Sequence, residues 1–390
     1  MSLPPLVSKL PDVGTSIFTV MTQLATECGA INLAQGFPDY DPPQALTEAL
    51  ARHARTSGHQ QYAPMPGLPR LRELISQKTA QLYHVPAPNP ATEVTITSGA
   101  TEALYAVLAA VVRPGDEVIV LEPAYDLYGP AIRLQGGIPV YVPLPAPDFR
   151  HDWDAVAAAL SPATRLIMLN SPHNPTGAVL ASADLDQLAA LLRNTATLVL
   201  SDEVYEHMVY DGQQHYSVLQ QPELAERAFV LSSFGKTYHA TGWKVGYCIA
   251  PPALTAELRR VHQFLTFSVS TPTQHALADV LGDAAHYETL SAFYQRKRDL
   301  FTELMQPTGF ELLPAPGAYF QLARYAQLSA EDDYTFAQRL TREAGVAVVP
   351  VSAFYHHGRN QGLIRFCFAK REETLVAAAQ RILKFCANIQ

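Results

Sequence analysis

The sequence is poor in charged residues for its length. Only 16% of its 390 residues are Asp, Glu, Lys or Arg, where about 25% is usual in soluble domains. The 28 basic and 36 acidic residues leave a net charge of −8. An acidic balance without basic clusters argues against nucleic acid as a partner. The low charge also indicates that part of the surface is buried, as it would be between subunits.

Cysteine and long hydrophobic runs are scarce too. Four cysteines lie far apart without a C-x-x-C pair, which excludes a small disulfide scaffold and gives no zinc or redox motif. The longest uncharged apolar stretch covers only residues 103–112, and a membrane-spanning helix needs about 20 residues. The first ten residues, MSLPPLVSKL, lack the apolar core of a secretory signal. We therefore expect a cytoplasmic protein with no membrane partner.

Short β-rich runs dominate the middle of the chain and predict an α/β domain. Helix-length segments at residues 101–112, 152–160 and 182–193 separate several of them, which favours a mainly parallel, buried sheet. The seven candidate strands lie at residues 94–97, 118–121, 139–142, 166–170, 198–201, 229–233 and 245–250.

The length and the change of pattern after residue 272 predict two domains. A single hydrophobic core stops growing near 250–300 residues. A long helical stretch extends to about residue 304, and short strands near 346–350 and 363–368 precede a C-terminal helix. We expect a large α/β domain over 46–272. Residues 1–45 and 273–390 would form a smaller α+β domain with an N-terminal arm.

Two segments could hold an anionic ligand at the edge of this sheet. Ser98-Gly99-Ala100-Thr101-Glu102 follows a strand and opens a helix, so its backbone N–H groups suit a phosphate. Read alone, such a segment is more often an ordinary helix cap. Residues 170–177, NSPHNPTG, end another strand in a proline-fixed turn that would hold Asn174 where α/β proteins bind ligands. A plain turn is the alternative there.

Two further segments carry a carboxylate and amines. Asp202 follows an apolar strand, and Tyr205 comes three residues later. A charge in that place needs a partner, although an isolated Asp is often a helix N-cap. Lys236 and Lys244 follow the next strand, and each alone could be a surface residue. Together the four segments supply a phosphate cradle, a carboxylate, hydrogen-bond donors and an amine, which are the needs of pyridoxal 5'-phosphate.

The strings that surround these residues are similar to one family. The sequence resembles the class I aminotransferases of the fold-type I pyridoxal-phosphate superfamily, and within them the branch that acts on kynurenine, glutamine and methionine. The resemblance extends over nearly the whole chain. It rests on INLAQGFPDYDPP, QYAPMPGLPRLRE, TSGATEAL, GDEVIVLEPAYDLY, NSPHNPTG, LVLSDEVYEH, SSFGKTYHATGWKVGY, APGAYF and IRFCFAK.

The resemblance implies a role for each residue around the cofactor ring. Lys236 would carry the Schiff base and then move the proton as general acid and base. Asp202 would keep the ring nitrogen protonated, and this makes the ring an electron sink. Asn174 and Tyr205 would hydrogen-bond the ring's phenolate oxygen. Tyr125 would stack on the ring face.

The resemblance also implies a shared phosphate site. The amides of Gly99, Ala100 and Thr101, the hydroxyl of Ser233 and the charge of Lys244 would bind the phosphate. Many relatives have arginine where Lys244 stands, so a bidentate contact is lost here. Tyr62 matches a tyrosine that reaches the phosphate of the neighbouring subunit, which would make the protein a homodimer with shared active sites.

For the substrate, the resemblance implies a carboxylate clamp and an apolar pocket. Arg365 would bind the α-carboxylate, completed by Gly36 and Asn174. Phe18 would line the side-chain pocket. Aspartate aminotransferases place a second arginine from the partner subunit there, and residues 264–274, FLTFSVSTPTQ, contain none. A neutral, apolar or sulfur-containing side chain is therefore favoured.

We thus expect a ping-pong aminotransferase that acts on methionine, or on an aromatic amino acid, glutamine or kynurenine, with a 2-oxo acid as acceptor. One alternative keeps the same site for β-elimination on cysteine S-conjugates. Another is a non-catalytic regulator that binds the cofactor, which the presence of Lys236 disfavours. We expect no metal, because His356 and His357 have no further ligands beside them in the pattern.

Overall fold

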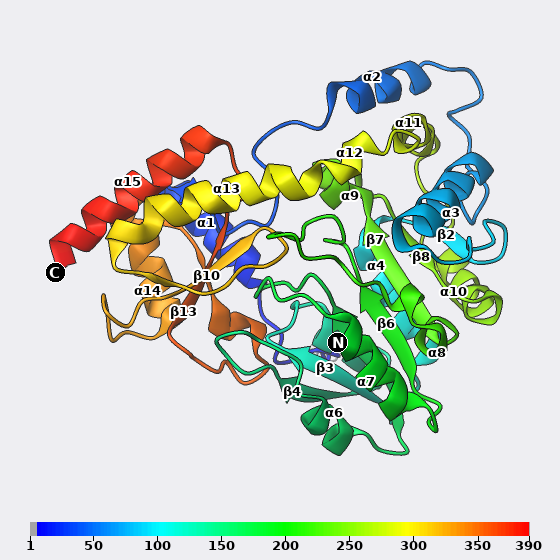
Figure 1. The fold of residues 1–390 in the computed structure, drawn as a ribbon, viewed down its shortest axis with the longest axis horizontal. Helices are drawn as coiled ribbons and strands as arrows, with labels where there is room; N and C mark the ends of the chain where they lie inside the picture. Colours follow the sequence, from blue (N-terminus) through cyan, green and yellow to red (C-terminus); the bar gives the residue numbers. More distant parts are fainter. Residues whose placement is uncertain (1–5, 390) are drawn as a thin grey trace, which may run out of the picture.

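The computed structural model describes residues 6–389, and a seven-stranded sheet forms its centre (Figure 1). The strand order is β2–β8–β7–β6–β5–β3–β4. The strands are β2 (Val94–Thr97), β3 (Glu117–Glu122), β4 (Ile138–Pro143), β5 (Thr164–Asn170), β6 (Leu198–Asp202), β7 (Ala228–Ser233) and β8 (Gly246–Ile249). All seven predicted strands are present within a few residues of their expected bounds.

The sheet is mainly parallel, as the sequence predicted. Strands β4, β3, β5, β6 and β7 pair in parallel along the sheet. The exception is β8, which runs antiparallel to both of its neighbours, β2 and β7. Strand β2 therefore runs in the same direction as these five, so six strands end at one edge and the segments that follow them are brought together there.

Both faces of the sheet are buried. In β3, Val118 and Val120 belong to one hydrophobic cluster, whereas Ile119 and Leu121 belong to another. Successive side chains of a strand point to opposite faces, so one cluster lies on each side of the sheet. Helices α4 and α10 cover one side, and α7 packs in the cluster of the other. Such double burial explains why the strands are continuous apolar runs rather than alternating ones.

The described residues form fifteen α-helices. They are α1 (Ile17–Cys28), α2 (Gln44–His53), α3 (Pro69–Tyr83), α4 (Gly99–Val111), α5 (Tyr128–Leu134), α6 (Trp153–Ala159), α7 (Ser182–Leu192), α8 (Pro222–Ala225), α9 (Phe234–Thr237), α10 (Pro252–Leu265), α11 (Thr271–Leu281), α12 (Ala285–Glu288), α13 (Leu290–Met305), α14 (Asp333–Arg339) and α15 (Glu372–Ile389). Among the described residues, no helix is both long and apolar enough to cross a membrane.

A second group of strands lies in the C-terminal part of the chain. The four-stranded antiparallel sheet has the order β12–β13–β10–β9. Its strands are β9 (Glu311–Leu312), β10 (Phe320–Arg324), β12 (Val349–Pro350) and β13 (Leu363–Cys367), and β1 (Ile31–Asn32) pairs in parallel with β11 (Val346–Ala347). Because β1 and β11 are paired, a segment near the N-terminus packs with the C-terminal part of the chain. Helices α1 and α15 both lie at the left of Figure 1. The proposed boundaries at 46 and 272 remain a prediction.

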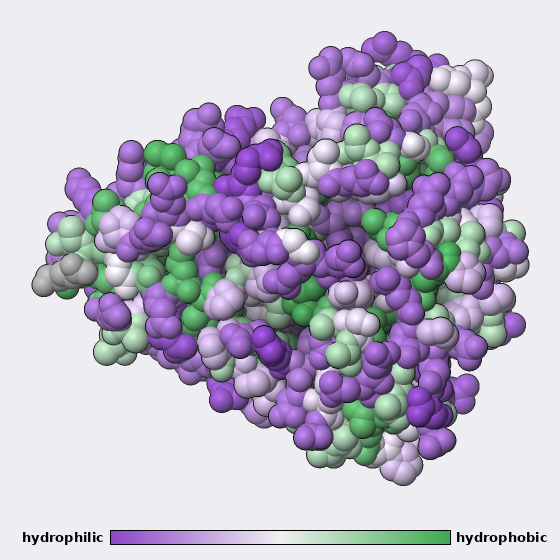
Figure 2. All heavy atoms as spheres, viewed as in Figure 1, coloured by the Kyte–Doolittle hydropathy of each residue, from purple (hydrophilic) through white to green (hydrophobic). Residues whose placement is uncertain are grey.

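The helical stretch expected from residue 272 to about residue 304 is broken. Helix α11 ends at Leu281 and α13 begins only at Leu290, with the single turn of α12 between them. Gly282 follows α11 directly, and glycine is a weak helix former. Helix α13 then runs leftward across the upper half of Figure 1, below α2, toward α15. Figure 2 shows hydrophilic side chains over most of this face, interrupted by smaller apolar areas.

Candidate active site

A cavity of about 390 Å³ lies where the parallel strands β5, β6 and β7 end. It brings together every site residue expected from the sequence except Tyr62. Those that line it are Phe18, Gly36, Gly99, Ala100, Thr101, Tyr125, Asn174, Asp202, Tyr205, Ser233, Lys236, Lys244 and Arg365. Segments from residue 18 to residue 365 therefore converge on one place, and the roles expected for these residues remain predictions.

Tyr62 lies outside this cavity. Its side chain is 82% exposed, and its ring meets Phe267 edge to face with centroids 5.3 Å apart. It lines a different, polar depression together with Ser268 and Ser270. An exposed aromatic side chain of this kind is typical of a contact surface. Its expected contact with a neighbouring subunit remains a prediction.

The N-terminus of α4 offers backbone donors to the cavity. Ser98 precedes the helix and makes no side-chain cap hydrogen bond, so the ordinary-cap reading of this segment was wrong. Gly99 has φ +72°, and a Cβ built on it would lie 3.3 Å from Nζ of Lys244. The helix therefore begins with free N–H groups beside a cationic side chain, an arrangement that suits an anion.

Lys244 is positioned by an unusual backbone conformation. It lies in the left-handed region at φ 52°, directly after the short 3-10 helix Thr241–Trp243. Its Nζ donates to Oγ1 of Thr101 at 3.3 Å. Gly246 lets β8 pass under the start of α4, because a Cβ there would approach the amide nitrogen of Ala100 to 2.9 Å. The close approach keeps the amine and the amides on one side.

Asp202 is a buried carboxylate at the end of β6 without a cationic hydrogen-bond partner among the described residues. Its Oδ2 accepts from the hydroxyl of Tyr128 at 2.7 Å, and its Oδ1 accepts from the Val204 amide at 3.4 Å. Burial raises the pKa of Asp202 to about 6. A carboxylate held in this way gains from a protonated group placed opposite it.

Lys236 lies in the cavity wall at the end of β7, with only neutral hydrogen-bond partners. Its Nζ donates to the carbonyl oxygen of Gly36 at 3.1 Å and to the hydroxyl of Tyr319 at 2.9 Å. Desolvation lowers the pKa of Lys236 to about 8. A substantial fraction of this amine is therefore neutral near physiological pH, which is the form that attacks a carbonyl carbon.

Arg365 and Asn174 form a connected pair across the two sheets. Arg365 lies on β13, is fully buried, and donates from Nη1 to Oδ1 of Asn174 at 2.7 Å and from Nη2 to the Ala34 carbonyl at 2.8 Å. The Asn174 backbone is fixed in turn by Oδ1 of Asn170 at 2.8 Å. Because Oδ1 of Asn174 is used by Arg365, its amide NH₂ remains available to a ligand.

Aromatic rings surround the guanidinium of Arg365. Its Cζ lies 4.0 Å from the ring centroid of Phe320, 5.1 Å from that of Phe354 and 5.2 Å from that of Phe18. Its Nε has no hydrogen-bond partner among the described residues. Desolvation lowers the pKa of Arg365 to about 10. A buried cation with an unused donor is prepared to receive an anionic ligand.

Tyr125 and Tyr205 complete the walls. Burial raises the pKa of Tyr125 to about 12 and raises that of Tyr205 further, so both phenols are neutral donors at physiological pH. Ser233 lines the cavity between β7 and Lys236. The phenol of Tyr205 meets Tyr319 edge to face at 5.0 Å.

The sequence did not single out three residues that the structure places in this site. Tyr128 donates to Asp202, Tyr319 accepts from Lys236, and Phe320 packs on Arg365. Each of them lies in a string that carries the family resemblance, EPAYDLY or APGAYF. Their position in these strings was a signal, but their contacts depend on pairing between distant strands.

The residues present fit pyridoxal 5'-phosphate. The free amides of α4 and Lys244 suit its phosphate, and buried Asp202 suits a protonated ring nitrogen. Lys236 supplies the amine, and Tyr205 and Asn174 supply neutral donors. The buried Arg365 is then left over for the substrate carboxylate.

The comparisons with known proteins identify the family. Residues 29–382 match the family described as Aminotransferase class I and II. The chain belongs to this family of enzymes, whose class I members use pyridoxal 5'-phosphate. It is therefore a pyridoxal-phosphate-dependent aminotransferase of fold type I. The enzyme class, fold and cofactor expected from the sequence are confirmed.

Individual relatives are similar over nearly the whole chain. Methionine aminotransferase of Escherichia coli is 52% identical, covering 98% of this chain and 99% of that protein. Kynurenine–oxoglutarate transaminase of Dictyostelium discoideum is 33% identical, covering 95% and 94%.

Solved structures of aminotransferases have the same fold as this chain. YbdL from Escherichia coli, for which a methionine aminotransferase function is described, superimposes with a TM-score of 0.94 at 52% identity, covering 97% of this chain and all of that chain. An aspartate aminotransferase mutant from Thermus thermophilus gives 0.89 at 32% identity, covering 98% of this chain and all of that chain.

Proposed function

We propose that this aminotransferase takes its amino group from a neutral apolar or sulfur-containing L-amino acid, with methionine favoured, and passes it to a 2-oxo acid. The observation that carries the proposal is the setting of Arg365, a buried guanidinium enclosed by aromatic rings. The 52% identity to a methionine aminotransferase supports the same substrate class. Aromatic amino acids, glutamine and kynurenine remain further candidates.

Arg365 would bind the α-carboxylate of the substrate. It lies opposite the strand ends that carry Lys236 and Asp202, and Asn174 holds one side of its fork. The planar guanidinium matches a carboxylate in two parallel hydrogen bonds. A carboxylate fixed there would direct the substrate's Cα toward Lys236. Gly36, whose carbonyl accepts from Lys236, would close the clamp.

The residues of the cavity wall that faces Arg365 would hold the cofactor. Pyridoxal phosphate, when bound, supplies a carbonyl carbon for imine exchange with amines and a ring that accepts the electron pair from Cα. The N-terminal amides of α4 with Ser233 and Lys244 would bind its phosphate. Asp202 would face its ring nitrogen, Tyr125 its ring face, and Tyr205 with Asn174 its phenolate oxygen.

Lys236 would move the proton at the reacting carbon. With a pKa lowered to about 8, its amine takes up and releases a proton at physiological pH. Tyr319 and the Gly36 carbonyl hold the amine through hydrogen bonds of 2.9 and 3.1 Å, so its position is fixed before the substrate enters. An oriented base contributes about 10²–10⁴-fold to a rate.

The side-chain pocket would favour apolar groups. Phe18, held by α1, packs edge to face on Phe354 with centroids 5.9 Å apart. A thioether makes favourable contacts with aromatic rings. The carboxylate of Asp126 accepts from Ser16 at 3.0 Å and interacts electrostatically with Arg365. Its negative charge would disfavour a substrate with a second carboxylate.

Tyr62 and the subunit arrangement are part of the same proposal. We propose a cytoplasmic homodimer in which Tyr62 of each subunit reaches the partner's phosphate site. The exposure of its ring, beside the exposed Phe267, supports a contact there. All four cysteines are free, which suits a reducing compartment.

β-Elimination on a cysteine S-conjugate is the less favoured outcome at this site. The similar proteins reported above are described as aminotransferases and transaminases.

A panel of amino donors against several 2-oxo acids tests the proposal. We expect methionine to be the best donor, with kcat/KM about 100-fold above aspartate, and no pyruvate or ammonia released from a cysteine S-conjugate. Lys236→Ala is the control without turnover. A preference for aspartate, or release of ammonia, would contradict the proposal.

A further inference from the structure

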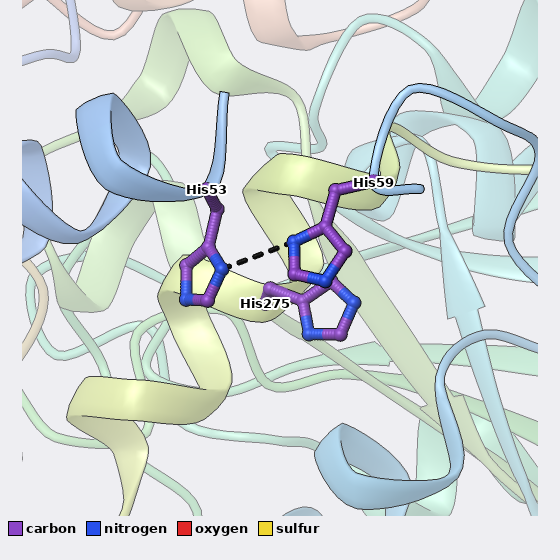
Figure 3. Close-up of side chains that lie close together, drawn as sticks. All are labelled: His53, His59 and His275. Carbon is purple, nitrogen blue, oxygen red and sulfur yellow. Dashed lines mark hydrogen bonds between the residues drawn. The ribbon is translucent and has the colours of Figure 1, made fainter. Parts of the chain in front are cut away.

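Three histidines from separate segments meet near the surface, away from the cofactor cavity. His53 is the last residue of α2, His59 lies in the loop that follows it, and His275 lies on α11, which packs against α2 (Figure 3). One ring nitrogen of each lies within 4.8 Å of the others, and all three side chains are half-buried. Aminotransferase chemistry at the cavity uses none of them.

The spacing of the nitrogens is close to that of a metal site. Nδ1 of His53 and Nδ1 of His59 are 3.1 Å apart. Two nitrogens bound tetrahedrally to one zinc ion at 2.0–2.1 Å lie about 3.3 Å apart. The rings of His59 and His275 stack with centroids 3.8 Å apart, so the third imidazole is also within reach.

A carboxylate stands behind one of the rings. Oδ2 of Asp279, one turn after His275 on α11, lies 2.7 Å from Nε2 of His53 and also accepts from Arg52. This contact places the proton of His53 on Nε2 and leaves a lone pair on Nδ1, directed at His59. Metal-binding histidines are oriented in the same way by a carboxylate on the other ring nitrogen.

We propose that His53, His59 and His275 bind a divalent transition-metal ion of the zinc class, with water at the remaining position. Imidazole ligands suit zinc, copper and nickel, and three neutral imidazoles with water match a four-coordinate zinc site. The three histidines are far apart in the sequence and form no spaced motif, which is why the sequence predicted no metal. The proposal replaces that prediction.

Binding requires the rings to turn. The rings of His59 and His275 are nearly parallel, at 7°, whereas ligands of one ion point their lone pairs at a common centre. His275 makes no side-chain hydrogen bond to the described residues, so its ring can turn on its side-chain torsions. Nδ1 of His53 and Nδ1 of His59 face one another at hydrogen-bond distance, so the ion would replace this contact and both rings would tilt toward it.

A bound ion would connect three segments. It would tie the end of α2 and α11 to the loop that leads from His59 to Tyr62. The exposed Arg55 lies between the ligands His53 and His59, in the segment that joins α2 to this loop. Cross-linking the loop restricts its opening, which is the motion a protease needs.

Isothermal titration calorimetry of the holoenzyme with zinc chloride tests the proposal. We expect one ion per chain, and His275→Ala should weaken binding by about 100-fold or more. Asp279→Asn should weaken it by about tenfold, since it removes only the orienting carboxylate. His357→Ala is the matched control, because it removes one of two adjacent histidines at another exposed site.

Tryptic cleavage after Arg55 provides the second measurement. Zinc should slow it in the unaltered protein and in His357→Ala, but not in His275→Ala. Equal zinc affinity in His275→Ala and the unaltered protein, or the absence of a stoichiometric binding step, would overturn the proposal. Unchanged circular dichroism of His275→Ala excludes misfolding as the reason for a loss.

Discussion

Two enclosed lysines in this molecule have opposite electrostatic surroundings. Lys78 of α3 is buried, with its Nζ 2.9 Å from Glu206 Oε1 and 3.0 Å from the hydroxyl of Tyr247. Although desolvation opposes it, the charge of Glu206 raises the pKa of Lys78. Lys236 has the Gly36 carbonyl and the Tyr319 hydroxyl instead, and desolvation lowers its pKa to about 8. Both amines are desolvated, so the charge of the hydrogen-bond partner, rather than burial itself, decides which amine is neutral enough to react.

Asp202, the last residue of β6, and Glu206, in the segment that follows it, show the same contrast. Despite its burial, Glu206 has a lowered pKa because Lys78 lies beside it, and it also accepts from Tyr83 and Ser232. Asp202 accepts from the neutral Tyr128, and burial raises its pKa to about 6. Glu206 is satisfied inside the protein, whereas Asp202 gains from a cationic ligand. The ion pair of Glu206 and Lys78 stabilises the fold, whereas Asp202 offers a negative charge to a ligand.

Replacing the reactive lysine should have the largest effect on activity. Lys236→Ala should lower kcat by at least about 10³-fold, because the amine that holds the cofactor and moves the proton is lost. Its free energy of unfolding without cofactor should not fall, since no ionic partner is left behind. Steady-state kinetics and urea unfolding measure the two quantities. Activity of Lys236→Ala close to that of the unaltered enzyme would contradict the claim that Lys236 is the reactive lysine.

Replacing the structural lysine should reverse that pattern. Lys78→Met should lower the free energy of unfolding by about 3–5 kcal/mol, because Glu206 is left buried without its cation. The matched control is Lys78→Met combined with Glu206→Gln, which should recover most of the loss. Urea unfolding at neutral pH measures both. A loss as large in the double variant as in the single one would show that the ion pair is not the cause.

Removing the charge of Asp202 sharpens the contrast between the carboxylates. Asp202→Asn should lower kcat by about 100-fold, since a neutral amide does not keep the cofactor's ring nitrogen protonated. Tyr128→Phe, which keeps the carboxylate, should cost less than about tenfold. Single-turnover kinetics with methionine measures the effect on the chemical step. Equal losses in the two variants would contradict the role given to the charge.

The lowered pKa of Lys236 predicts a pH dependence for cofactor uptake. Only the neutral amine attacks, and its fraction rises as pH increases toward its pKa of about 8. Between pH 6 and pH 8 this fraction grows by roughly fiftyfold, so the second-order rate of uptake should grow in parallel. Stopped-flow absorbance of apoprotein mixed with cofactor records it. A rate still rising tenfold per unit above pH 9 would mean an unshifted lysine.

Changing the aromatic wall should have the smallest effect. Phe18→Ala should lower the preference for methionine over alanine by about tenfold, through loss of apolar contact with the side chain. The α-carboxylate clamp remains, so turnover of alanine itself should change little. Competition between the two donors measures the ratio. An unchanged ratio would remove Phe18 from the side-chain pocket.

Much of the fold could be predicted because its strands are buried on both faces. Runs such as residues 118–121 and 198–201 are continuous and apolar, and each became a strand. The break between α11 and α13 was missed, since one glycine in an otherwise helical pattern is a weak signal. The antiparallel direction of β8 was also not predicted, because direction depends on the connection rather than on composition.

The site was predictable where residues follow strand ends. Asn174, Asp202 and Lys236 all do so, and parallel strands bring such positions together. The contacts of Tyr319 and of the histidine cluster were not predictable, because they join elements far apart in the chain. Tyr319 at least lies in the string APGAYF, whereas no local pattern marks the histidines.

Covalent capture of the cofactor tests the central claim most directly. Reduction of the holoenzyme with borohydride fixes pyridoxal phosphate to the amine that holds it, and mass spectrometry of the peptides locates the added mass. We predict the addition on Lys236, and on neither Lys78 nor Lys244. An addition on Lys78 or Lys244, with Lys236 unmodified, would contradict the account.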